Sequence, residues 1–167
     1  MQWFTLLSTL LGTTIGVAST LIAERFRSRD ARRQHRETAR VEIYLGFLQA
    51  MNESAEALRS LASRVDRLTP EELEESNRQV FQGSRLYVMR ERVILFAPNS
   101  VAAAMNEVFN SLLTMREATA QRRGRHSPEF LARIGEYADA VQILRVEMRR
   151  DIGAAPLQDD IDWAPRG

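Results

Sequence analysis

Apolar side chains recur every three or four residues along most of the chain beyond Arg40, which is the spacing of one face of an α-helix. One run continues unbroken to Leu68, and three more follow it. Leu45, Phe47 and Leu61 flank the first run. The predicted core positions of the four helices are Val41, Tyr44, Leu48, Met51, Ala55, Leu58, Ala62 and Val65; Leu73, Val80, Phe81, Leu86, Tyr87, Val93, Ile94 and Phe96; Val101, Met105, Val108, Phe109, Leu112 and Met115; and Phe130, Ile134, Ala138, Val141, Leu144, Met148 and Ile152.

Capping signals mark the expected helix boundaries. Thr69–Glu72 has the pattern of a capping box with proline at the first helical position, and Ser127–Pro128 repeats such a start. Gly153 suits the position just after a last turn. Gly83 weakens the middle of the second helix. The run Val93–Phe96 has the composition of a strand, but an isolated strand would have no partner, so we expect it to be helical.

The predicted helices are about 28, 27, 23 and 24 residues long and are joined by short loops, as in an antiparallel bundle. We therefore predict an all-α fold in which residues 41–153 form an up-down-up-down four-helix bundle. An extended coiled-coil dimer would leave the apolar stripes of the later three helices uncovered.

Residues 1–23 contain no charged side chain. As a helix, the segment from Trp3 to Ala23 would extend about 32 Å, enough to cross a hydrocarbon core of about 30 Å. It is therefore a candidate transmembrane helix. The basic residues that follow predict an N-terminus outside and the bulk of the chain in the cytoplasm, at the inner membrane. Because many serines and threonines make the span only moderately apolar, a helix buried in a soluble core or lying in the interface is the alternative.

Small side chains recur every fourth residue within this span. This spacing lets two membrane helices approach closely, and it predicts a homodimer. The alternative is that small residues are simply common in membrane helices. The four positions are Ser8, Gly12, Gly16 and Thr20.

Residues 24–40 carry seven arginines against three acids and contain no helix breaker, so we expect a helical stalk. At about 100° per residue most of the arginines share one side. This basic stripe could hold anionic lipid at about 1 kcal/mol per arginine, or it could serve only as a stop-transfer signal. No nucleic-acid partner is expected, since aromatic interleaving and recognition motifs are absent. The stripe consists of Arg25, Arg29, Arg32, Arg33, Arg36 and Arg40.

The amino-acid composition excludes several kinds of catalytic and redox chemistry. The chain is 44% apolar and 27% charged, with a formal charge of +1, as is typical of a globular domain. It has no cysteine, and all 23 of its basic residues are arginine, which excludes disulfides, thiolate chemistry and catalytic lysines. His35 and His126 lie in arginine-rich stretches without metal-ligand neighbours. We expect no cofactor and no metal.

One acidic pattern is a candidate for catalysis. Glu71–Glu75 on one helix and Glu136 with Asp139 on another echo the EExxE and ExxD spacing of all-α nucleotide pyrophosphohydrolases, which hold Mg²⁺ between helices. Acids in a first helical turn also complement the helix dipole, and that is the interpretation we favour. The acidic segment 154–167 is expected to be a flexible tail that either folds back onto the basic stripe or stays solvated.

The order of these features resembles that of small membrane-anchored helical proteins of high-GC bacteria. The segments that carry the resemblance are Ala23–Arg27, Arg32–Arg33, Glu42–Leu48, Arg92–Ala97 and Met148–Gly153. The resemblance implies the architecture and no catalytic residue. We expect a non-enzymatic interaction or scaffold protein that contacts the bilayer and a protein partner. The alternatives are a membrane-perturbing oligomer that assembles through Gly12 and Gly16, and a Mg²⁺-dependent nucleotide hydrolase.

Overall fold

The computed structural model describes residues 37–155, and this part of the chain is helical without any strand. Its first helix is described from residue 37 and ends at residue 62. The elements that follow are a 3₁₀ turn η1 (Val65–Arg67), α2 (Pro70–Gly83), α3 (Leu86–Phe96), α4 (Asn99–Ala120) and α5 (Pro128–Asp151).

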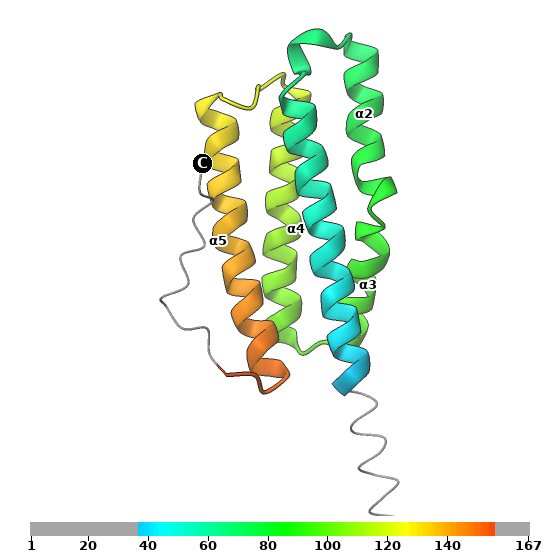
Figure 1. Cartoon of the computed structure of the whole chain (residues 1–167), viewed down its shortest axis with the longest axis vertical. Coiled ribbons are helices and arrows are strands. Elements are labelled where there is room, and N and C mark those ends of the chain that lie inside the picture. Colours follow the sequence, from blue (N-terminus) through cyan, green and yellow to red (C-terminus); the bar gives the residue numbers. More distant parts are fainter. Residues whose placement is uncertain (1–36, 156–167) are drawn as a thin grey trace, which may run out of the picture. The chain divides into compact units, whose positions relative to one another are not determined.

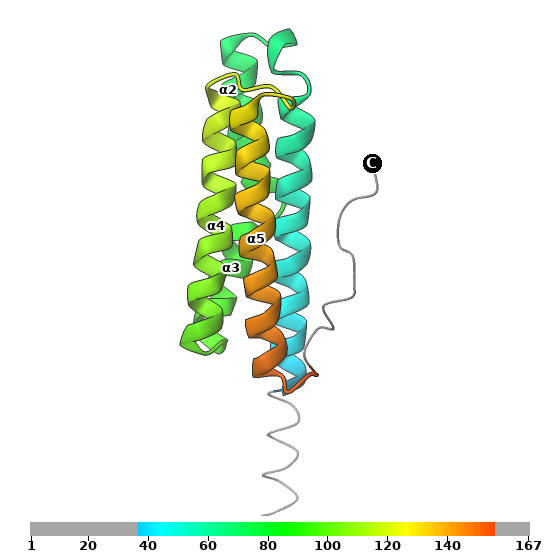
Figure 2. The same ribbon diagram turned by 90° about the vertical axis from the view of Figure 1, so that its left-hand side faces the viewer.

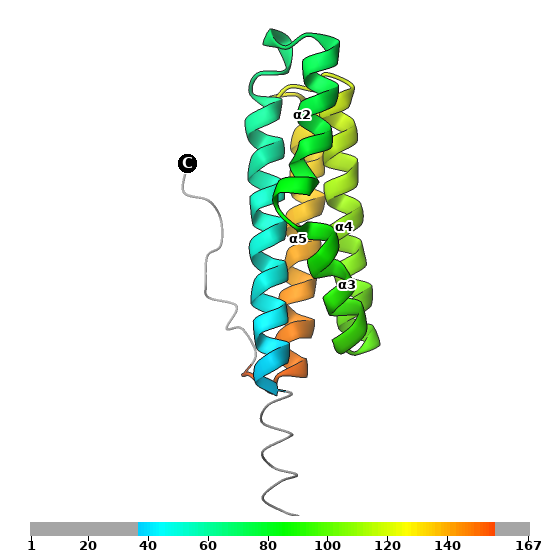
Figure 3. The ribbon, with the colours of Figure 1, turned by 90° about the vertical axis from the view of Figure 1, so that its right-hand side faces the viewer.

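These elements form a helical bundle with antiparallel neighbours (Figure 1). α2 and α3 follow each other along one side of it, as the view in Figure 3 shows. The start of the first described helix, the α3–α4 loop and the end of α5 lie at one end, which we call the entry end because the described part of the chain begins there. The loops 63–69 and 121–127 lie at the opposite, far end (Figure 2).

The core runs the length of the bundle. Phe47, Met51 and Leu58 of the first helix are fully buried, as are Phe81 and Phe130. A smaller cluster of Leu61, Val65 and Leu73 closes the far end. All six core positions predicted for the third helix are buried on α4, namely Val101, Met105, Val108, Phe109, Leu112 and Met115.

The predicted second helix is not continuous. It breaks at Ser84 and Arg85, where Arg85 adopts left-handed backbone angles with φ 56°. Phe81 and Leu86 are both buried, although positions five residues apart in one helix would point about 140° from each other. The break rotates α3 so that both side chains reach the core, and Ser84 anchors it through a hydrogen bond of 2.8 Å between its Oγ and that of Ser54.

The same rotation overturns part of the predicted core. Leu86 and Val93 are buried as expected, but Tyr87, Ile94 and Phe96 are exposed. The prediction assumed that one helical face continues from residue 70 to residue 96. Because the chain breaks at Arg85, the buried face of α3 does not continue the buried face of α2.

Four further expectations were wrong at helix ends and edges. The first helix ends at residue 62 rather than at Leu68, because the chain turns through η1 to start α2. On α5 the buried side chain is Tyr137 instead of Ala138, and Ile152 is exposed because it lies past the last helical residue. Leu45, predicted to flank the first stripe, is 61% exposed.

The predicted caps are confirmed. The Thr69 hydroxyl accepts from the Glu72 backbone N–H, and the Glu72 carboxylate accepts from the Thr69 N–H, which completes the capping box. The Ser127 hydroxyl accepts from the Phe130 N–H. Gly153 has φ +68°, the left-handed conformation expected of the residue that ends a helix.

A polar cluster ties the first helix to the end of α5. The Tyr44 hydroxyl donates to Asp151 Oδ2 at 2.6 Å, and Arg40 Nη1 donates to Asp151 Oδ1 at 3.1 Å. Burial, and then the hydrogen bond to Asp151, raise the pKa of Tyr44 above its usual value of 10.0. The cluster joins the two chain segments that meet at the entry end.

We expect Arg85→Gly to stabilise the fold by about 0.5–1 kcal/mol, because glycine adopts positive φ without steric cost. The control Arg92→Gly, at an exposed position inside α3, should instead lose about 0.5–1 kcal/mol. Urea denaturation of both variants measures the difference. If both variants changed the free energy of unfolding in the same direction, Arg85 would not be strained.

The raised pKa of Tyr44 makes stability depend on alkaline pH. The unfolded chain ionises this tyrosine near pH 10 while the folded chain keeps it neutral, so its contribution is complete below pH 10 and falls as the pH rises further. Tyr44→Phe should reduce that fall by up to about 1.4 kcal/mol per pH unit, measured by urea denaturation between about pH 9 and 12. Burial also raises the pKa of Tyr137, so a smaller dependence should remain. Identical slopes in wild type and Tyr44→Phe would contradict the expectation.

Candidate functional site: a groove between α2 and α4

Most of the residues singled out for the membrane lie outside the described part of the chain. These are Ser8, Gly12, Gly16 and Thr20 of the small-residue stripe, and Arg25, Arg29, Arg32, Arg33 and Arg36 of the basic stripe. Arg40 is described, and its guanidinium binds Asp151 while its side chain stays 40% exposed. Within residues 37–155 no helix is both long enough and apolar enough to cross a bilayer.

Four of the acidic residues weighed for Mg²⁺ binding have partners within the bundle. Glu72 closes the capping box, Glu74 and Glu75 pair with Arg78, and Glu136 pairs with Arg133. α2 and α5 occupy opposite corners of the bundle (Figures 1 and 2). Over residues 37–155 there is no group of three or more histidine, aspartate or glutamate side chains able to hold a metal ion.

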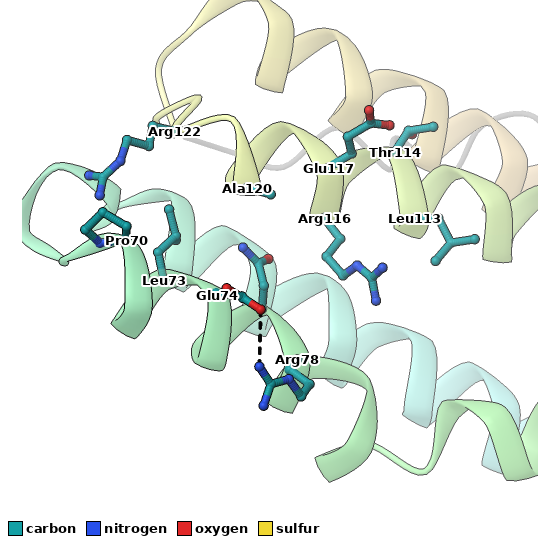
Figure 4. A pocket seen from close by; sticks show the side chains of 11 residues that line it. Pro70, Leu73, Glu74, Arg78, Leu113, Thr114, Arg116, Glu117, Ala120 and Arg122 are labelled. Atoms are coloured by element: carbon teal, nitrogen blue, oxygen red, sulfur yellow. Dashed lines mark hydrogen bonds and ion pairs between the residues drawn. The ribbon is translucent and has the colours of Figure 1, made fainter.

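A groove lies between α2 and α4 near the far end, with a volume of about 780 Å³. Pro70 and Leu73 line it from α2, and Leu113 and Ala120 line it from α4. Figure 4 shows Leu113 and Arg116 directed from α4 toward α2. The apolar side chains give the groove a surface that could bury a partner's side chain.

Three arginines surround these apolar side chains, each held in place. Arg78 forms ion pairs with Glu74 at 3.3 Å and Glu75 at 2.8 Å. Arg122 donates to the backbone carbonyls of η1 and the loop that follows it, at 2.9 and 3.0 Å. The Arg116 guanidinium stacks over the Phe81 ring, 5.4 Å from its centroid. Figure 4 shows the Glu74–Arg78 pair as a dashed line.

Arg116 is the cation most available to a ligand. It forms no ion pair with any side chain of residues 37–155, whereas Arg78 already has two carboxylate partners. Stacking on Phe81 fixes the plane of the guanidinium and leaves its N–H groups to donate at the edge. A carboxylate or a carbonyl oxygen that enters the groove would complement it.

A buried amide adds a second polar group to the groove. Asn77 is only 7% exposed, and its Oδ1 accepts a hydrogen bond of 2.7 Å from Thr119 Oγ1. Its Nδ2 has no partner among the described residues. Burying an unpaired amide donor costs about 1–3 kcal/mol. Because protein atoms cover Nδ2, an acceptor in the groove would reach it only if the lining side chains moved.

The sequence analysis missed this site. The available signal was an asparagine on the buried side of a helix, four residues after Leu73 and four before Phe81. Such a position normally carries an apolar side chain. The contact between Asn77 and Thr119 could not be predicted, because 42 residues separate the two in the chain.

Comparison of the chain with protein-family models, curated proteins and solved structures finds no match.

Replacing Asn77 with leucine should leave the free protein as stable as the wild type or raise its stability by up to about 1 kcal/mol, because the unpaired Nδ2 is removed. Thr119→Val should destabilise by about 1–3 kcal/mol, because it takes the hydroxyl from Asn77 Oδ1 and leaves a buried acceptor unpaired. Thermal unfolding compares the two. A large loss in Asn77→Leu would mean that the amide is satisfied in the free protein.

Proposed function

We propose that the protein is a membrane-anchored helical interaction module with no catalytic activity of its own. In this proposal residues 1–23 form a single transmembrane helix with its N-terminus outside, and residues 24–40 form a cytoplasmic stalk. Residues 41–153 act as an up-down-up-down four-helix bundle that binds a protein partner.

The α2/α4 groove is the observation that supports binding of a protein partner. It combines apolar side chains with the Arg116 guanidinium, which forms no ion pair with the described side chains. A groove between two helices suits a partner segment that buries apolar side chains and offers oxygen acceptors. By contrast, Glu72 on α2 closes the capping box, and Glu74 and Glu75 pair with Arg78, which favours binding over hydrolysis.

The membrane part is supported by the sequence. An uncharged span of 23 residues precedes a segment in which arginines outnumber acids by seven to three. This order matches a membrane helix followed by its cytoplasmic flank. The small-residue stripe of Ser8, Gly12, Gly16 and Thr20 supports a homodimer within the bilayer.

The proposal is tested in native membranes with a photo-crosslinking amino acid at Ala120, an exposed position that lines the groove. The matched control places it at Ala132, an exposed alanine on α5. We expect a membrane-bound adduct with a second protein from position 120 and none from 132. The adduct should be lost with Leu113→Glu and kept with Leu131→Glu. Only self-adducts, or equal adducts at both positions, would overturn the groove as a partner site.

A further inference from the structure

The turn between α3 and α4 at the entry end differs sharply in charge from the two loops at the far end. At the far end, residues 63–75 contain seven charged side chains and residues 117–129 contain five. At the entry end, residues 92–106, which join α3 to α4, contain Arg92 and no other charged side chain. Loops that face water are normally polar, so the turn at the entry end has an unusual composition.

The same turn exposes large apolar side chains. Leu95 is 75% exposed, Phe96 is 55% exposed and Ile94 is 41% exposed. All three lie in the last turn of α3, while Val93 beside them is fully buried. Ile152, at the end of α5, adds a further half-exposed apolar side chain to this end of the bundle.

Positive groups accompany these apolar side chains. Arg92 is exposed and forms no ion pair with the described residues. α4 begins at Asn99 without a side-chain cap, so the positive end of its dipole is not offset by a capping oxygen. The last turn of α5 also carries Arg149 and Arg150, of which Arg149 donates to the Ala155 carbonyl and Arg150 pairs with Glu147. Aromatic and aliphatic side chains next to arginine are typical of surfaces that lie in the interface of an anionic membrane.

The connectivity of the chain also indicates that a membrane lies at this end of the bundle. Residues 1–39, with their uncharged first 23 residues, join the bundle at Arg40, and the Arg40–Asp151 pair lies at the entry end. The end that exposes Leu95 and Phe96 is therefore the end to which the proposed anchor is attached. The heavily charged far end has the composition of a surface in water.

We propose that the entry end of the bundle is a second membrane contact, in which Leu95 and Phe96 insert into the interface of the anionic cytoplasmic leaflet and Arg92 binds lipid phosphate. The inference rests on the proposed membrane anchor. The arginines that precede the bundle would be attracted to the same anionic head groups, which favours a bundle held close to the bilayer. The bundle is then held against the membrane with its far end and the α2/α4 groove toward the cytoplasm.

The test uses the full chain in vesicles of phosphatidylcholine and phosphatidylglycerol. Because the chain has no cysteine, a single environment-sensitive NBD label can be placed at Leu95→Cys. Leu131→Cys is the matched control, since Leu131 is a 51% exposed leucine at the far end. We expect doxyl-labelled lipid to quench most of the emission at position 95 and little of that at 131. Arg92→Gln should lessen the quenching in anionic vesicles and have no effect in pure phosphatidylcholine.

Flotation of the same samples separates the two proposals. If the chain does not float with the vesicles, the anchor is refuted and this contact falls with it. If it floats but position 95 is no more quenched than 131, the anchor stands and the second contact is refuted. A blue-shifted label at 95 that doxyl lipid does not quench would mean that protein covers α3, which also overturns the proposal. Leu95→Glu with Phe96→Glu should abolish quenching from a label at Ile94→Cys without changing flotation.

Discussion

The arrangement depends on covering the apolar stripe of α4, which packs against α2, α3 and α5. Met105, Leu112 and Met115 on that stripe are fully buried, and they need apolar partners from every neighbouring helix. A single straight helix cannot direct both Phe81 and Leu86 at the core, so the chain between residues 70 and 96 divides into α2 and α3. The left-handed backbone at Arg85 is the local cost of that coverage.

Dividing the helix has a consequence at each end of the bundle. Toward the far end, α2 leaves a groove against α4, and the Asn77 amide remains unpaired beside it. Toward the entry end, the changed register of α3 turns Ile94, Leu95 and Phe96 to the surface. Both candidate binding surfaces therefore arise from the packing requirement that shapes the core. Neither requires catalytic groups, and both offer apolar surface beside arginine.

The two surfaces lie toward opposite ends of the bundle and differ in their surroundings. The groove lies near strongly charged loops, where an apolar floor with fixed polar donors favours a specific partner segment. The entry end has almost no charge in its turn, and it adjoins the attachment point of an uncharged sequence. A module held at a membrane by one end and binding its partner near the other could bring that partner to the bilayer.

The sequence by itself determined the helical class, the caps at Thr69, Ser127 and Gly153, and the buried stripe of α4, because periodicity and capping are local properties that neighbouring residues specify. Tertiary structure decided the break at Arg85, the early end of the first helix and the burial of Tyr137. It also decided the groove and the meeting of Asn77 with Thr119. These features depend on contacts between residues far apart in the chain, where the need to fill the core outweighs local preference.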